Sequence, residues 1–133
     1  MFNPHVLVIP GWYPTEFKTL EGCFFREQAI ALSNHGFKTG VVAPQVIYLG
    51  SLRSRKNYKT GFNKYLDNGV MTYQRQHWNL FPKLHSWREA RNLSIGMHLF
   101  ERYADENGLP DIIHAHVALY GGHVASQISK KFN

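Results

Sequence analysis

Short apolar runs alternate with longer amphipathic segments along the first third of the chain. Residues 5–10 (HVLVIP) and 38–43 (KTGVVA) are rich in β-branched side chains without polar alternation, which is typical of strands buried on both faces. Residues 21–35 between them carry apolar side chains at helical spacing, and Gly36 is a helix stop. Strand, helix and strand in this order favour parallel pairing through a right-handed crossover.

The middle of the chain is less regular. Pro44 is expected to end the second strand, and residues 45–68 give no clear periodicity. Residues 69–78 (GVMTYQRQHW) alternate well enough to predict a strand with one polar face. Apolar residues spaced three and four apart then predict a helix over 87–107, with Ser86 as its N-cap.

The last predicted elements are a strand over 111–116 (DIIHAH) and a helix that begins at Tyr120 or Gly121. The complete order predicts an α/β fold: a doubly wound, mostly parallel, Rossmann-like sheet with helices on both faces. Ligands of such sheets bind beyond the carboxyl ends of the strands. Two segments are expected there, 11–22 and 116–122.

Composition narrows the class of protein. The 133 residues suit one domain, and 44% apolar with 18% charged residues is a globular composition. A formal net charge of +6 suggests an anionic partner. The single cysteine, Cys23, excludes an internal disulfide and a Cys-rich zinc fold. Because neither a secretory signal pattern nor an apolar run of the ~20 residues that span a bilayer is found, we expect a cytoplasmic protein.

The first candidate segment is the loop 11–22 (GWYPTEFKTLEG). It matches neither the dinucleotide fingerprint nor the P-loop. A loop bounded by Gly11 and Gly22 before a helix can still bring backbone N–H groups to a phosphate or a sugar hydroxyl. Alternatively, Gly11 and Pro14 only turn the chain and the aromatic side chains pack.

The second candidate segment surrounds His116. His114 and His116 are two apart on the predicted strand and so share a face, with His116 at the strand end. A neutral imidazole there can hydrogen-bond a sugar hydroxyl or take up a proton, and Gly121-Gly122 permits close approach of a ligand. The alternative is a structural histidine whose hydrogen bonds are satisfied within the protein.

Two further groups of residues were considered. His114, His116 and His123 could bind a metal, but no HExxH motif accompanies them, so no metal is predicted. A basic stretch without acids could bind anionic lipid head groups or a phosphorylated acceptor, could bind nucleic acid, or could be a solvated loop. No nucleic-acid motif accompanies it, and peripheral membrane contact ranks above nucleic acid. Its basic residues are Arg53, Arg55, Lys56, Lys59 and Lys64.

Both candidate segments, taken together and in order, resemble the N-terminal domain of retaining glycosyltransferases of the GT-B type, family 4. The resemblance covers residues 6–44, including FFREQAIALSNHGFKTGVV, and residues 110–130, including DIIHAH and YGG. Two departures are Glu21-Gly22, where the family often has two glycines, and Phe37, where it usually has histidine.

The resemblance implies a function for several residues. His116 would contact the transferred sugar as the catalytic residue, without a metal or other cofactor. The nucleotide-sugar donor and the saccharide or lipid-linked acceptor would lie near Gly11, Gly22 and the segment Tyr120, Gly121 and Gly122. Residues 1–133 would be one acceptor-side domain, incomplete at its C-terminus and inactive without a donor-binding domain of the same polypeptide. Such an enzyme would build polysaccharide or glycolipid in the cytoplasm, at the inner face of the membrane.

Two other function classes stay open. A stand-alone, non-catalytic Rossmann-like module could bind an anionic ligand, and a histidine-metal site could serve a hydrolase. Sugar, nucleotide, acceptor, linkage and oligomeric state are not indicated by the residues.

Overall fold

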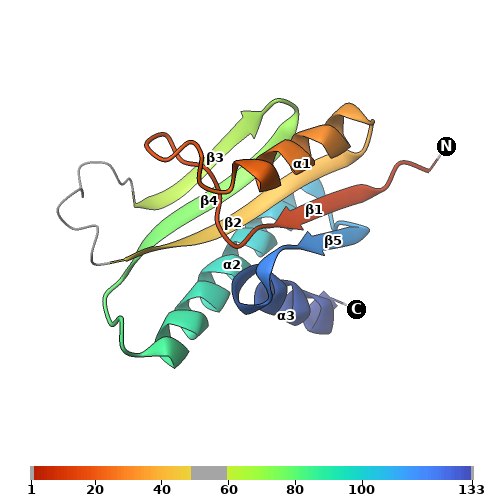
Figure 1. Cartoon of the computed structure of the whole chain (residues 1–133). Coiled ribbons are helices and arrows are strands. Elements are labelled where there is room, and N and C mark those ends of the chain that lie inside the picture. Colours follow the sequence, from red (N-terminus) through yellow and green to blue (C-terminus); the bar gives the residue numbers. More distant parts are fainter. Residues whose placement is uncertain (1, 49–59, 133) are drawn as a thin grey trace.

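In the part of the chain that the structure describes, a five-stranded sheet packs with three α-helices and a short π-helical segment (Figure 1). The computed structural model describes residues 2–48 and 60–132. In chain order the elements are β1 (His5–Ile9), α1 (Cys23–Asn34), β2 (Lys38–Tyr48), β3 (Gly61–Asp67), β4 (Val70–Asn79), α2 (His85–Asn107), β5 (Ile112–Ala115) and α3 (His123–Phe132). The α/β class is therefore confirmed.

The strands lie in the order β3-β4-β2-β1-β5. Strands β1, β2, β4 and β5 are parallel, and only β3 is antiparallel to its neighbour β4. Strand β1 lies between β2 and β5, and all five of its residues are buried. This explains the unbroken apolar run at 6–9, because both faces of the strand contact other elements.

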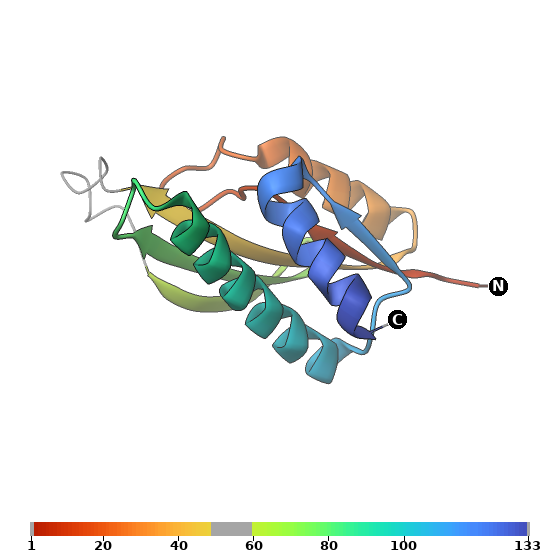
Figure 2. The same ribbon diagram turned by 90° about the horizontal axis from the view of Figure 1, so that it is seen from below.

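Helices pack on both faces of the sheet (Figure 2). On one face α2 and α3 lie side by side over a core that includes Leu7, Val42 and Leu99. On the other face α1 covers a smaller core that includes Val8 and Ala29. Alternate residues of the same strand thus belong to different cores, as the two-residue period of a strand requires.

Strand β2 is longer than predicted, because it continues through Pro44 to Tyr48. Its pairing with β1 extends only as far as Val41, so at Pro44 the strand has β4 as its single partner. The missing N–H of proline is tolerated where a strand lacks a second neighbour. The expectation that Pro44 ends the strand was wrong for this reason.

The β3–β4 hairpin was not predicted. Asn68 and Gly69 join the strands and both have positive φ, of 46° and 86°. Asn-Gly, with both residues in the left-handed region, is a preferred two-residue turn of β-hairpins, so Asn68-Gly69 was the sequence signal for this hairpin. The residues of β3 are mostly exposed and show no regular alternation of apolar and polar positions, because an edge strand packs little against the core.

Helix α2 begins at His85, and no side chain caps it, so Ser86 is not its N-cap. Its buried face includes Asn92, Ile95, Leu99 and Tyr103, and so lies about one position before the apolar residues Leu93, Met97, Phe100 and Ala104 that predicted the helix. Helix α3 follows a short π-helical segment, Val117–Gly122, so regular helix starts two residues after Gly121. The helix start predicted at Tyr120 or Gly121 therefore falls within this π-helical segment.

Candidate functional site

The carboxyl edge of the sheet is uneven, and this produces a pocket. Strand β1 ends at Ile9, whereas β2 and β4 continue together until Tyr48 lies opposite Asn79. The space beyond the end of β1 is a pocket of about 350 Å³, within the range of small-molecule sites. We call it the edge pocket, and its lining is Gly11, Trp12, Thr15, Lys18, Glu21, Gln45, Val46, Ile47, Tyr48, Gln76, Asn92 and Tyr120.

The lining of the edge pocket combines side-chain amides, tyrosine hydroxyls and an indole ring. Gln45, Gln76 and Asn92 each offer both donors and an acceptor. The Tyr48 and Tyr120 hydroxyls are 3.3 Å apart. Burial, and then the hydrogen bond to Tyr48, raise the pKa of Tyr120 to about 12, which keeps this hydroxyl protonated. Lys18 and Glu21, which also line the pocket, form an ion pair of 2.9 Å. Neutral polar groups beside a paired charge suit a ligand with many hydroxyls.

Gly11 and Tyr120, two of the predicted ligand-binding residues, are brought together in this pocket. Gly11 also lies against the start of the π-helical segment, since a Cβ there would lie 2.8 Å from Cγ2 of Val117. Close packing of the β1 end against this segment therefore requires glycine at position 11.

Gly22, Gly121 and Gly122 lie against the protein backbone and do not line the edge pocket. Gly22 has φ of +69°, and a Cβ there would lie 2.6 Å from the Trp12 carbonyl oxygen. A Cβ on Gly121 would collide with the carbonyl oxygens of Ile9 and His116, whereas one on Gly122 would be 3.4 Å from that of Val117. Backbone packing explains Gly22 and Gly121 without any ligand.

His116 lies beside the edge pocket but does not line it. Its backbone N–H donates to Ile9 O at 2.9 Å, which fixes the end of β5 against β1. Its ring stacks on Phe25 of α1, with centroids 4.4 Å apart, and on His114 at 4.3 Å. Burial, and then the electrostatic interaction with His114, lower the pKa of His116, so the ring is neutral at pH 7. Its Nε2 is buried without a hydrogen-bond partner among the described residues.

A second, larger cavity adjoins the edge pocket and shares Thr15 and Gln76 with it. It has a volume of about 750 Å³ and lies between the loop after β1, helix α1 and the β3–β4 hairpin. Its lining is Tyr13, Pro14, Thr15, Glu16, Phe17, Thr19, Arg26, Thr60, Gly61, Phe62, Asn63, Tyr65, Asp67, Gln74 and Gln76.

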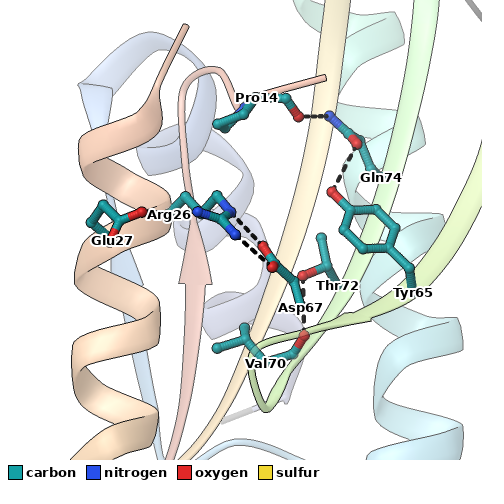
Figure 3. Close-up of polar contacts among 8 residues, drawn as sticks. All are labelled: Pro14, Arg26, Glu27, Tyr65, Asp67, Val70, Thr72 and Gln74. Carbon is teal, nitrogen blue, oxygen red and sulfur yellow. Dashed lines mark hydrogen bonds and ion pairs between the residues drawn. The ribbon is translucent and has the colours of Figure 1, made fainter. Parts of the chain in front are cut away.

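Polar contacts hold the walls of this second cavity together (Figure 3). The Arg26 guanidinium of α1 makes two hydrogen bonds to the Asp67 carboxylate of β3, of 2.6 and 2.7 Å. Gln74 donates to the Pro14 carbonyl and accepts from the Tyr65 hydroxyl, both at 3.2 Å. Burial raises the pKa of Tyr65 to about 12. The hairpin is therefore tied both to α1 and to the loop after β1.

The amide side chains were missed by sequence reasoning. Gln74 and Gln76 lie on the predicted polar face of residues 69–78, so alternation was the signal for them. Gln45 follows the proline that was expected to end its strand, and Asn92 lies within a helix. No local sequence pattern marks either of these two residues as part of a site.

Several predictions fall elsewhere. Arg53, Arg55, Lys56 and Lys59 lie outside the described residues, and Lys64 forms an ion pair with Glu106. Within residues 2–48 and 60–132, no group of three or more His, Cys, Asp or Glu side chains is placed to hold a metal ion. No helix in the same ranges is long and apolar enough to cross a bilayer.

Compared with protein-family models, with curated proteins and with solved structures, the chain matches none of them.

Proposed function

We propose that the edge pocket binds a saccharide, and that the chain is the acceptor-side part of a sugar-nucleotide-dependent glycosyltransferase of the GT-B type. The observation that carries the proposal is the edge pocket itself, at the carboxyl ends of parallel strands and lined mostly by neutral donors and acceptors, with the Lys18–Glu21 ion pair among them. Sugar hydroxyls both donate and accept hydrogen bonds, and amides and tyrosine hydroxyls do the same. Trp12 adds an apolar ring surface for the face of a sugar.

Under this proposal the sheet is a doubly wound, Rossmann-like one. The neutral ring of His116 would hydrogen-bond the transferred sugar at the rim of the pocket. Its unpartnered Nε2 supports that role, since a buried nitrogen without a partner is costly unless a ligand or water supplies one. Gly11 and Tyr120 would contact the sugar, and the acceptor would be a saccharide or a lipid-linked one.

Ligand titration followed by NMR tests the proposal. Isotope-labelled chain is titrated with maltose, UDP-glucose and GDP-mannose. We expect the amide signals of Gly11, Trp12 and Tyr120 and the ring signals of His116 to shift on saturation. Signals that shift only at sites remote from the edge pocket, or none that shift, would refute the proposal.

A matched pair of variants locates the binding. Gln76→Ala removes one amide from the pocket and should weaken saccharide binding about tenfold, the equivalent of about 1.4 kcal/mol. Gln28→Ala removes the same group from the exposed side of α1 and should leave the affinity unchanged. Equal affinities of the two variants would place the saccharide elsewhere.

A further inference from the structure

Five polar side chains come from the end of β4 and the first turns of α2, and among them His77 lies close to Arg91 and Asn92. His77 and Asn79 come from alternate positions near the end of β4, and Arg88, Arg91 and Asn92 come from α2. We call this group the arginine corner. None of these five residues is among the ligand-binding or catalytic residues predicted from the sequence.

Buried polar atoms without partners are concentrated in the arginine corner. His77, Asn79 and Asn92 are only 5%, 1% and 2% exposed. Nine buried side-chain N or O atoms lack a hydrogen-bond partner in the described part of the chain, and seven of them belong to this corner. Because an unpaired buried polar atom costs about 1–3 kcal/mol, a concentration of this kind indicates that the corner holds something besides protein.

The charge of the corner is positive. Arg91 and Arg75 of β4 both lie near His77, and neither they nor Arg88 forms a salt bridge within residues 2–48 and 60–132. The Nε atoms of Arg88 and Arg91 are buried and unpartnered. Glu89 is an acid that lies near Tyr120. The Arg88 guanidinium lies over the Tyr120 ring, 6.0 Å from its centroid. Arg88 Nη2 donates to His85 Nδ1 at 3.0 Å, and the Arg91 guanidinium lies 5.3 Å from the centroid of the Trp87 ring. Two guanidinium forks without an acidic partner are suited to phosphate oxygens.

The corner is continuous with the edge pocket. Asn92 belongs to both: its side chain lines the pocket, and its Oδ1 is buried without a partner. Tyr120 is a second link between the edge pocket and the corner, since it lines the pocket and its ring lies under the Arg88 guanidinium. A ligand that fills the pocket can therefore extend one group into the corner.

We propose that the arginine corner binds the phosphate group of a phosphorylated saccharide whose sugar ring lies in the edge pocket. Arg88 and Arg91 hold the phosphate oxygens, and Asn92 accepts a hydrogen bond from a neighbouring sugar hydroxyl. The neutral imidazole of His77 and the amide of Asn79 complete the polar surroundings. This proposal rests on the proposed function in assigning the sugar to the pocket, and it adds the phosphate and the residues that bind it.

Calorimetric titration of the chain tests the proposal with three probes: inorganic phosphate, maltose and glucose-1-phosphate. We expect glucose-1-phosphate to bind at least tenfold more tightly than either of the other two. Arg88→Gln and Arg91→Gln should each weaken its binding about tenfold or more, and should leave maltose unaffected. Arg88→Lys and Arg91→Lys keep the charge and lose the fork, so they should give intermediate affinities.

Arg102→Gln is the matched control, because it removes the same charge from the other end of α2. Each variant is first shown to be folded by its amide spectrum. An equal loss in Arg102→Gln would mean unspecific attraction by net charge and would overturn the proposal. So would unchanged affinity in the Arg88 and Arg91 variants, or the absence of binding of both phosphate probes.

Two outcomes separate this proposal from the proposed function. If the parent chain binds maltose at the edge pocket but binds glucose-1-phosphate no more tightly than maltose, the arginine corner alone is refuted. Binding of phosphate at the corner without any saccharide binding refutes the glycosyltransferase proposal alone. Vesicles that carry a polyprenyl phosphate then distinguish the source of the phosphate: binding to them that Arg91→Gln abolishes indicates a lipid-linked ligand, and binding of glucose-1-phosphate alone indicates a soluble one.

Discussion

At the scale of single residues, His77 shows how burial decides the state of a titratable group. Burial lowers the pKa of its imidazole to about 4, and the positive charges of Arg91 and Arg75 add to the effect. The Asn92 side chain lies close enough to the imidazole to oppose this lowering of the pKa. The ring is consequently neutral at pH 7 and offers one donor and one acceptor.

This shift predicts a pH dependence of stability. An unfolded histidine titrates near 6.5, so between pH 6.5 and about 4 the unfolded chain binds more protons than the folded one. The free energy of unfolding should therefore fall over this range, by up to roughly 3 kcal/mol from His77. Urea denaturation at neutral pH and near pH 4 measures the loss.

The variant His77→Gln should lose less stability than the parent chain on acidification. Some loss should persist, because the pKa values of His5 and His116 are also lowered by burial. His98→Gln, which alters an exposed histidine of α2, is the control and should behave like the parent. An identical loss in all three proteins would contradict the assignment to His77.

At the scale of elements, the entry into α1 depends on one glycine. Gly22 is the N-cap of α1 in a left-handed conformation, and no side chain caps the helix. The same glycine lies against the Trp12 carbonyl, so it fixes the loop after β1 relative to the helix. The lining of the edge pocket by Trp12, Lys18 and Glu21 depends on this loop.

Comparison of two glycine variants tests this role. Gly36, at the other end of α1, also has positive φ, but a Cβ there would meet nothing within 4 Å. Gly36→Ala should therefore cost only the backbone strain, roughly 1–2 kcal/mol. Gly22→Ala should cost about 1–3 kcal/mol more, because the loop must move away from the added methyl group. Equal losses of unfolding free energy would show that the Trp12 contact is unimportant.

At the scale of the whole molecule, two cores of unequal size share one sheet. The core under α2 and α3 includes Phe100 and Tyr103, whereas the core under α1 is built mostly of smaller side chains. Strands β1 and β2 contribute to both cores, while β3 pairs with β4 alone in the described residues and is largely exposed. Stability is therefore expected to decrease from β1 and β2 toward β3.

Amide hydrogen exchange measures this gradient. Amides of β1 and β2, for example those of Val8 and Val42, should exchange most slowly, since they open only on global unfolding. Hydrogen-bonded amides of β3 should exchange much faster, through local opening of the hairpin. Protection in β3 equal to that in β1 would show that the hairpin and the sheet unfold as one unit.

The sequence alone determined the α/β class, the parallel β1–α1–β2 unit and the approximate bounds of all three helices. These follow from local periodicity, because a strand buried on both faces must be apolar throughout and a helix with one buried face must repeat every three to four residues. It also placed Gly11 and Tyr120 at the carboxyl edge, since parallel strands end there together.

Only the tertiary structure decided how far β2 extends, how β3 pairs, and which side chains meet. The edge pocket exists because β2 and β4 continue beyond β1, and relative strand length leaves no mark on local periodicity. His77 and Asn92 are distant in sequence and polar, so nothing local predicts that they are buried together. Their burial depends on the packing of α2 on β4, and packing is a property of the folded chain as a whole.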